Sequence, residues 1–421
     1  MKLKVNTFTV KEVCFGPADS FVQGRLTINK EGLIRQLLKD GNIKSASLDI
    51  ALPGQRKRIA HILDVIKPIA DVEKANCFPG LLGNTSTAGD GEINQLEGLD
   101  LMTCGYFNTE DEILRTREAI VDMWGENRKY SPFSQGAHLV LTLVPQDDAE
   151  VRAADQAVRL AGLLAARHIA ALTLGQEPEE SEIFAYQPPV EGLPKVVLVL
   201  QLASIGVLFD TLIYGRTVDG MLPTLIHPNE LMAGAVVSDE YFYGGQRQPT
   251  IHYQQNPLVK ELYARHGRDL NFAGIIVTRG YYNTDIDKRR AAGHVARLAE
   301  MLGADGAILH PESGGNSHVD AMLGTQALER LGIKTVLIAA EMGDEKSSDV
   351  SLIDFVPEAT AIISAGNREL LVEIEEADEV IGGGKIIDTD TPAGAAQKVP
   401  LNHYFCANSQ LGAWTISMDA I

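Results

Sequence analysis

Residues 222–257 have the sequence LPTLIHPNELMAGAVVSDEYFYGGQRQPTIHYQQNP, near the middle of a chain of 421 residues. The stretch holds two histidines, His227 and His252, together with several acidic residues. A Gly-Gly pair at residues 244 and 245 separates two extended runs. Imidazole, carboxyl and aromatic groups lie close together in this segment, which indicates a functional site.

The composition is that of a soluble globular protein, with 45% hydrophobic and 22% charged residues. The net charge of −19 argues against nucleic-acid and anionic-membrane partners, because both need a clustered basic surface. The N-terminus alternates apolar and polar residues like a strand, and we expect a cytoplasmic protein with no signal peptide. The four cysteines are far apart and form no CxxC pair, which is typical of reduced thiols.

Residues 1–175 are predicted to form a β-rich N-terminal domain. Apolar and polar alternation predicts its strands at residues 4–10, 25–29, 45–51 and 137–143. Helices are expected at residues 31–39 and 147–171, the second capped by Asp147 and Asp148. Residues 176–194 carry the charge run EPEESE and the proline-rich run QPPVEGLP, so they are expected to form a solvated linker.

Residues 195–421 are predicted to form an α/β domain that carries the site. Apolar runs alternate with amphipathic stretches, which indicates right-handed βαβ units on a parallel sheet. Ligands bind beyond the carboxyl ends of such strands. This rule selects the loops at residues 278–285, 310–320 and 340–348. The predicted fold class is therefore α/β, with a mostly β N-terminal region before a parallel-sheet C-terminal domain.

The loop HPESGGNSHVD at residues 310–320 is the richest of the three in polar groups. Its glycines at 314 and 315 allow the backbone to approach a ligand closely. An alternative interpretation is that Asn316, Ser317 and Asp320 only cap the following helix. The sequence contains no P-loop, GxSxG or HExxH motif, so no compact catalytic signature decides between these alternatives.

The chain resembles the proprotein subunit of component B of glycine, sarcosine and betaine reductases, and more distantly that of D-proline reductase. The motifs that carry the resemblance are spread over most of the chain: FPGLLG at 78–83, YSPFS at 130–134, LPTLI at 222–226, GAVVS at 234–238, PTIHYQQNP at 249–257, ELYARHG at 261–267 and GGN…D at 314–320. The resemblance implies an oxidoreductase that cleaves a substrate C–N bond reductively, as part of a hetero-oligomeric complex.

In this family, the resemblance implies, the precursor cuts itself before an internal cysteine that becomes a pyruvoyl group. The pyruvoyl carbonyl captures the substrate amine, and a partner subunit, usually a selenoprotein, attacks the substrate carbon. The cysteine should follow GAVVS, but residues 238–243 read SDEYFY. We therefore expect no self-cleavage and no pyruvoyl group in this chain.

Relative to the family pattern, His227, His310 and His318 replace other residues. Imidazole and carboxylate are the usual ligands of zinc and non-haem iron, and a bound divalent metal could polarise a substrate in place of the pyruvoyl carbonyl. We therefore predict these three histidines as metal ligands. The alternative is that they are surface or hydrogen-bonding residues.

The remaining candidate site residues are taken from the same segments. The predicted catalytic residues are Glu240, His252 and Glu312, and the predicted substrate-binding residues are Asn316, Asp320 and Tyr243. The favoured function is reductive or metal-assisted cleavage of a C–N or C–heteroatom bond in a small amine. The alternatives are a scaffold subunit that binds a selenoprotein-B-like partner with selenocysteine or cysteine, and a free-standing binding protein.

Overall fold

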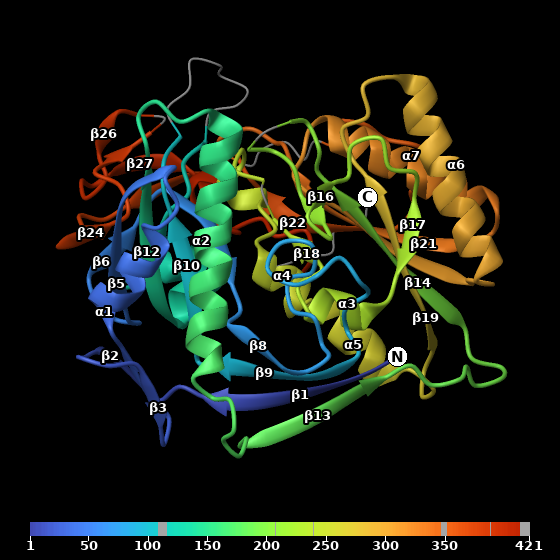
Figure 1. Cartoon of the computed structure of the whole chain (residues 1–421). Helices are drawn as coiled ribbons and strands as arrows, with labels where there is room; N and C mark the ends of the chain where they lie inside the picture. The colour runs from blue at the N-terminus through green and yellow to red at the C-terminus, as the bar shows by residue number, and fades with distance from the viewer. Residues whose placement is uncertain (108–115, 207, 239, 347–351, 388, 413–421) are drawn as a thin grey trace.

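The computed structural model describes residues 1–412, except 108–115, 207, 239, 347–351 and 388. Figure 1 shows two halves, each built around its own sheets, with the short helices α3 (Pro228–Met232), α4 (Thr250–Gln254) and α5 (Pro257–Arg265) between them. The predicted fold class is confirmed: the N-terminal half is rich in strands, and the C-terminal half is a largely parallel sheet covered by helices.

Two four-stranded sheets form most of the N-terminal half, in the orders β13-β1-β9-β8 and β5-β12-β10-β7. Their strands are β1 (Lys2–Thr9), β5 (Ile43–Ala51), β7 (Ile62–Ile66), β8 (Ile69–Glu73), β9 (Gly91–Glu97), β10 (Leu99–Cys104), β12 (Ala137–Pro145) and β13 (Glu180–Ala185). The long helix α2 (Val151–Ala171) packs on both sheets through its alanine and leucine face. It begins later than predicted, since the side chain of Glu150 caps it by accepting a hydrogen bond from Ala153 N at 3.0 Å.

Strand β13 lies within the segment predicted to be a solvated linker. It pairs antiparallel with β1, and its Phe184 side chain is buried in the core. The linker prediction missed this strand because its first four residues are exposed and include Glu180 and Glu182, so that only Phe184 gives a buried apolar signal. The domain boundaries at residues 175 and 195 stay predictions.

The C-terminal half holds a six-stranded sheet in the order β17-β19-β14-β20-β21-β22. Its strands are β14 (Lys195–Leu202), β17 (Thr224–Ile226), β19 (Asn271–Arg279), β20 (Gly306–Pro311), β21 (Lys334–Glu341) and β22 (Ile362–Asn367), and all but β17 run parallel to their neighbours. Helices α6 (Asp285–Met301) and α7 (Asn316–Arg330) cover one face, and α4 and α5 cover the other. The predicted βαβ pattern is therefore confirmed.

The chain then returns to the N-terminal half. Strand β24 (Glu379–Ile381) pairs parallel with β6 (Lys57–Ile59), and Arg58 on β6 is fully buried against Asp122 at 2.6 Å. Arg58 also donates hydrogen bonds to the carbonyls of Glu375 and Ala393 at 2.8 Å, so one guanidinium group joins segments more than 300 residues apart.

Short elements complete the described part of the chain. They are β2 (Glu12–Phe15), β3 (Ser20–Val22), β4 (Arg25–Ile28), α1 (Lys30–Leu37), β11 (Val121–Asp122), η1 (Glu126–Tyr130), η2 (Pro132–Gln135), β15 (Leu212–Ile213), β16 (Arg216–Thr217), β18 (Val236–Val237), η3 (Gly244–Gln246), β23 (Leu371–Ile374), β25 (Lys385–Ile386), β26 (Thr391–Pro392), β27 (Gln397–Pro400) and η4 (Leu401–His403).

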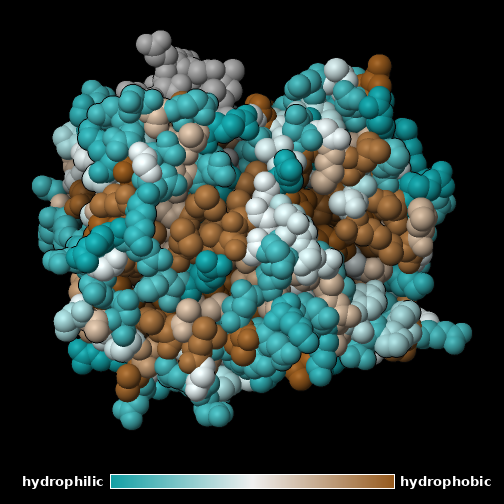
Figure 2. All heavy atoms as spheres, viewed as in Figure 1, coloured by the Kyte–Doolittle hydropathy of each residue, from teal (hydrophilic) through white to brown (hydrophobic). Residues whose placement is uncertain are grey.

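The visible surface is mainly hydrophilic. Figure 2 shows hydrophilic residues over most of the face viewed in Figure 1, with smaller hydrophobic patches between them. Among the described residues, no helix has the length and apolar character that crossing a membrane requires.

The Arg58–Asp122 pair gives a test of how the C-terminal segment is held. Replacing Asp122→Ala leaves a buried guanidinium without its carboxylate, so we expect the free energy of unfolding to fall by roughly 3–5 kcal/mol. The matched control is Glu373→Ala, which breaks an exposed pair with Lys398 at 3.0 Å and should cost less than about 1 kcal/mol. Urea denaturation measures both values, and equal losses would contradict the assigned role.

Candidate active site at the carboxyl edge of the C-terminal sheet

Two of the three loops selected from the sequence, at residues 278–285 and 310–320, meet at the carboxyl edge of the C-terminal sheet. Glu312, which follows β20, accepts a hydrogen bond at 2.6 Å from Ala203 N, which follows β14. The hydroxyl of Tyr281, which follows β19, lies 2.9 Å from the Ser313 hydroxyl oxygen. These strands are neighbours in the sheet and run parallel, so their carboxyl ends converge and the predicted crevice residues come together.

Glu312 is fully buried at this edge. Both of its carboxyl oxygens lie 2.7 Å from the donating hydroxyl of Thr211. Burial raises the pKa of Glu312 to about 8, because a charged carboxylate is poorly solvated inside the protein, and the nearby carboxyl group of Glu240 raises it further. Glu312 therefore holds a proton near neutral pH.

Glu240 is the second fully buried carboxyl group. Its Oε1 atom accepts hydrogen bonds from Phe242 N at 2.6 Å and Tyr243 N at 3.2 Å, which closes a tight turn over residues 240–243. Its Oε2 atom is buried without a hydrogen-bond partner among the described residues. Burial raises the pKa of Glu240 to about 7, although the positive charge of Arg247 opposes this shift.

Glu240 and Glu312 are both fully buried, and the charge of Glu240 is one of the causes that raise the pKa of Glu312; these two side chains are called the carboxyl pair below. Like charges in a dry site disfavour double ionisation, so an ionised Glu240 favours the protonated form of Glu312. Such a pair can bind a cationic nitrogen through its ionised member and can exchange a proton through its neutral member.

Arg247 holds the segment that carries Glu240 in place. Its guanidinium group is almost fully buried and donates hydrogen bonds to the backbone carbonyls of Ile62, Arg117 and Tyr241. Two of these carbonyls belong to the N-terminal half, so the site is built from both halves. Sequence reasoning missed this role, since an arginine in GGQRQP shows no pattern that marks it as buried.

His252 lies in α4 and packs against the core of the N-terminal half. Its ring stacks on Phe133 with the ring centres 5.4 Å apart. Burial lowers its pKa to about 3, so the imidazole is neutral at physiological pH. Burial raises the pKa of the next residue, Tyr253, and the charge of Glu312 is the next cause of this shift. The catalytic role predicted for His252 stays a prediction.

The predicted metal set is not supported by the geometry. His227 caps α3, where its Nδ1 atom accepts a hydrogen bond from Asn229 N at 3.1 Å, and its ring lies 6.0 Å from that of Tyr186. His318 instead lies 3.0 Å from Gln410 Oε1. Within the part of the chain that the structure describes, no three or more His, Cys, Asp or Glu residues are grouped so that they could hold a metal ion.

Strand alternation explains why His310 and His318 do not share a site. His310 lies two residues after Ile308, on the sheet face that packs against the larger core, whereas Leu309 faces α6 and α7. His318 lies in the first turn of α7, the helix on the opposite face. His310 is fully buried, neither ring nitrogen has a partner among the described residues, and burial lowers its pKa to about 3.

Asn316 and Asp320 connect the start of α7 to the loop after β19 and to α6. Asp320 forms a buried ion pair with Lys288 at 2.7 Å, and Asn316 Nδ2 donates a hydrogen bond to Tyr282 O at 3.3 Å. The capping alternative is also wrong, because Gly315 is the N-cap residue of α7 and no side chain caps this helix. Their predicted role in substrate binding stays a prediction.

Tyr243 lies at a cavity of about 270 Å³ beside the turn that carries Glu240. The guanidinium carbon of Arg368 lies 4.4 Å from the centre of the Tyr243 ring. The cavity lining comes from four separate parts of the chain, and includes Arg117, Phe242, Tyr243, Gly244, Arg368 and Asn402. The substrate-binding role predicted for Tyr243 stays a prediction, and Arg368 was not singled out from the sequence.

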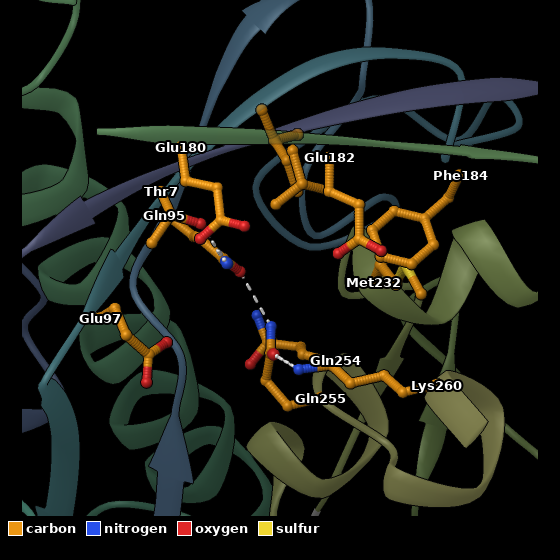
Figure 3. Close-up of a pocket in the computed structure, with 12 residues that line it drawn as sticks. Thr7, Gln95, Glu97, Glu180, Glu182, Phe184, Met232, Gln254, Gln255 and Lys260 are labelled. Carbon is orange, nitrogen blue, oxygen red and sulfur yellow. Dashed lines mark hydrogen bonds between the residues drawn. The ribbon is translucent and has the colours of Figure 1, made fainter. Parts of the chain in front are cut away.

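A second cavity, of about 230 Å³, lies at the junction of the two halves (Figure 3). A chain of two hydrogen bonds crosses this cavity. Lys260 Nζ donates to Gln255 Oε1, and Gln255 Nε2 donates to Gln95 Oε1 at 2.9 Å. Glu180 and Glu182 project into it from β13. None of the predicted site residues lines this cavity.

Comparison with known proteins decides the family. Residues 1–419 match the family model of glycine/sarcosine/betaine reductase component B subunits. The chain belongs to this family. It is 34% identical to the sarcosine reductase complex component B subunit alpha of Peptoclostridium acidaminophilum over 399 residues, which cover 92% of this chain and 91% of that protein.

Other relatives agree with this assignment to an oxidoreductase family. The betaine reductase complex component B subunit alpha of the same organism is 31% identical over 450 residues, covering 99% of both chains. The D-proline reductase proprotein PrdA of Acetoanaerobium sticklandii is more distant, with 24% identity over 76% of this chain and 51% of that protein. No solved structure is significantly similar to the chain. The resemblance found in the sequence is confirmed at the level of the family.

The raised pKa of Glu312 gives a pH-dependent test. The carboxyl group loses its proton near pH 4.5 when the chain is unfolded but keeps it to about pH 8 when folded. The folded state therefore binds more protons, and stability falls as the pH rises through this window. Relative to Glu312→Gln, the wild type should lose up to roughly 1.4 kcal/mol per pH unit between about pH 5 and 8.

Urea denaturation at a series of pH values measures this difference. The matched control is Glu191→Gln at an exposed carboxyl group, which should leave the shape of the wild-type curve unchanged. If the curves of wild type and Glu312→Gln run parallel, Glu312 is not the buried, protonated group described above.

Proposed function

We propose that this chain is an uncleaved component B subunit that binds a small amine-bearing substrate for reductive cleavage of its C–N bond. Family membership supports the reaction class, and the sarcosine and betaine reductase subunits among its relatives suggest amino acids of the glycine type as substrates. The proposal assigns the substrate nitrogen to the carboxyl pair.

The observation that carries the proposal is the place of Glu240. It lies in the segment SDEYFY at residues 238–243, where the family resemblance leads us to expect a cysteine, and its unpartnered Oε2 atom lies in the buried site shared with Glu312. An unpartnered buried carboxyl oxygen costs free energy, which a bound ammonium group would recover. The substrate is then held by charge and hydrogen bonds in place of a covalent bond.

The carboxyl pair also suits the chemistry of the leaving group. When the C–N bond breaks, its electron pair leaves with the nitrogen, and an amine leaves readily only if that nitrogen carries a positive charge. A carboxylate in a dry site stabilises the ammonium form of the substrate, so the nitrogen departs as a neutral amine. The neutral member of the pair keeps the total charge near −1, which matches one ammonium group.

The carbon must be attacked by a nucleophile from another subunit. We propose a partner of the selenoprotein B type, with selenocysteine or cysteine as the attacking group and as the source of the two electrons. The relatives are named as subunits of reductase complexes, which supports assembly with other chains.

The absence of self-cleavage predicts a single intact polypeptide. Mass spectrometry of the purified protein should give one species of about 45.6 kDa, and a hydrazide reagent, which labels a pyruvoyl carbonyl, should not label it. Two fragments that meet within residues 238–243, with a labelled N-terminus on the second, would contradict the uncleaved state.

Variants of the carboxyl pair test the proposed binding mode. Glu240→Gln should weaken binding of methylated glycines, measured by calorimetry, by at least about tenfold, because it removes the ionised member of the pair, whereas Glu312→Gln should weaken it less, because Glu312 is the protonated member. Turnover by the complex reconstituted with its partner should fall at least as far. Glu191→Gln is the matched control and should behave as wild type.

The scaffold alternative predicts a different result for the same variants. A scaffold subunit would bind its partner stably, but Glu240→Gln and Glu312→Gln would leave both amine binding and turnover unchanged. That result would contradict the proposed function.

A further inference from the structure

Gln410 is a fully buried side chain near the C-terminal end of the described chain. Its Nε2 atom donates hydrogen bonds to two backbone carbonyls, that of Pro311 at 2.9 Å and that of Ser313. These two residues stand on either side of Glu312 in the sequence. One side-chain amide therefore holds the backbone both before and after the buried carboxyl group.

The amide of Gln410 also joins two strands where their own pairing stops. The parallel ladder of β20 and β21 ends at the pair Leu309 and Leu337. Beyond this pair, Gln410 Oε1 accepts a hydrogen bond from Ala340 N on β21 at 2.9 Å, and the same oxygen lies 3.0 Å from His318 Nε2. Because Nε2 binds the end of β20, the side chain takes the place of the ladder hydrogen bonds between the separating strands.

The backbone after β20 has a conformation that needs such support. Ser313 has a φ angle of 61°, in the left-handed region that residues other than glycine seldom adopt. It is fully buried, and its hydroxyl oxygen lies 2.9 Å from the Tyr281 hydroxyl. A strained conformation persists only where its surroundings hold it, and Gln410 is bonded directly to the Ser313 carbonyl.

Glu312 is held from its other side by β14. Its backbone N–H donates a hydrogen bond to Gln201 O at 2.7 Å, and its carboxyl group accepts one from Ala203 N at 2.6 Å. The backbone is thus fixed by β14 on one side and by Gln410 on the other. This leaves the carboxyl group directed to the Thr211 hydroxyl inside the protein.

The residues before Gln410 fasten it to the segment that carries Glu240. Asn408 N donates a hydrogen bond to Gly245 O at 2.7 Å. The Ser409 hydroxyl oxygen lies 3.3 Å from Gln248 Oε1. Both acceptors belong to the segment that follows Glu240, so this short C-terminal stretch connects the two parts of the chain that supply the carboxyl pair.

We infer that Gln410 is a positioning residue, which fixes Glu312 in its buried place by holding the backbone on both sides of it. The inference adds a residue from the C-terminal end of the described chain to the site. Its consequence for substrate binding rests on the proposed function, because it assumes that the carboxyl pair receives the substrate nitrogen. The effect on Glu312 itself does not depend on that assumption.

The pH dependence of stability tests whether Gln410 acts through Glu312. Gln410→Met keeps the volume of the side chain but removes its three backbone hydrogen bonds. Water should then reach Glu312 and lower its pKa from about 8, because burial is the largest cause of the raised value. The folded state then releases the extra proton at lower pH, and the pH-dependent loss of stability ends earlier.

Urea denaturation over a pH series measures this limit. In each background, a protein with Glu312 is compared with its Glu312→Gln counterpart, and the limit is the pH above which their difference in stability stops changing. In the Gln410→Met background, this limit should lie at least about one pH unit below that of the wild type.

The matched control is Asn271→Leu. Asn271 is also buried, and its amide donates to the carbonyls of Val190 and Leu193 and accepts from Val190 N, at 2.8 to 3.1 Å. It makes the same three kinds of backbone hydrogen bond, but at the start of β19, at the opposite edge of the sheet. This variant should lose stability and keep the wild-type limit. A wild-type limit in Gln410→Met as well would overturn the inference.

Gln410→Asn provides a milder variant in case Gln410→Met does not fold. Asparagine keeps the amide but is shorter by one methylene group, so it cannot reach both carbonyls beside Glu312. Its limit should also lie below that of the wild type. A folded Gln410→Asn protein with an unchanged limit would count against the positioning role.

Binding of methylated glycines separates this inference from the proposed function. Gln410→Met should weaken binding in the wild type and have a smaller effect in the Glu312→Gln background, since it acts through Glu312. An equal loss in both backgrounds would overturn the inference. If the variants of the carboxyl pair leave binding unchanged while Gln410→Met still lowers the pH limit, the proposed function is contradicted and the positioning role stands.

Discussion

The site depends on one buried carboxyl group, that of Glu312, which lies out of contact with water at the end of a central strand. Glu312 follows β20 and is fully buried, so every part of its surroundings must either solvate it or keep it neutral. The backbone N–H of Ala203 and the hydroxyl of Thr211 provide hydrogen bonds at 2.6 and 2.7 Å. These two donors lie in the segment after β14, so the neighbouring strand determines the environment of the acid.

The second carboxyl group reaches the site because the segment before α4 is fixed by close backbone packing. At Gly244, a Cβ atom would lie 2.4 Å from the carbonyl oxygen of Glu118, so no other residue fits there without a shift. The carbonyl of Gly244 accepts a hydrogen bond from Cys406 N at 3.0 Å. The turn with Glu240 is thus held between the N-terminal half and the C-terminal end of the described chain, which gives a rigid site.

The strands and helices were predictable where a single physical pattern decides them. The run at residues 195–202 is apolar except for Lys195 and Gln201, because β14 lies in the middle of a sheet covered on both faces, and its bounds agree with the prediction. Strand β13 was missed because it is an edge strand whose first four residues are exposed, and its Glu180 and Glu182 gave this segment the appearance of a solvated charge run. The start of α2 was misplaced because three acidic residues precede it, and only one of them, Glu150, reaches the first free N–H groups.

The sequence by itself determined the fold class, the family and the loops that carry the polar residues, because these follow from periodicity and from motifs that are local in the chain. Only the tertiary structure decided which polar groups share a site. His310 and His318 are eight residues apart, yet His310 lies on the sheet face toward the larger core and His318 lies in α7, which covers the other face. Glu240 and Glu312 are 72 residues apart, yet the charge of Glu240 contributes to the raised pKa of Glu312. Arg368 meets Tyr243 from a segment 125 residues away. Charge and hydrogen bonding act through space, and the path of the chain between two residues leaves no periodic signal of their contact.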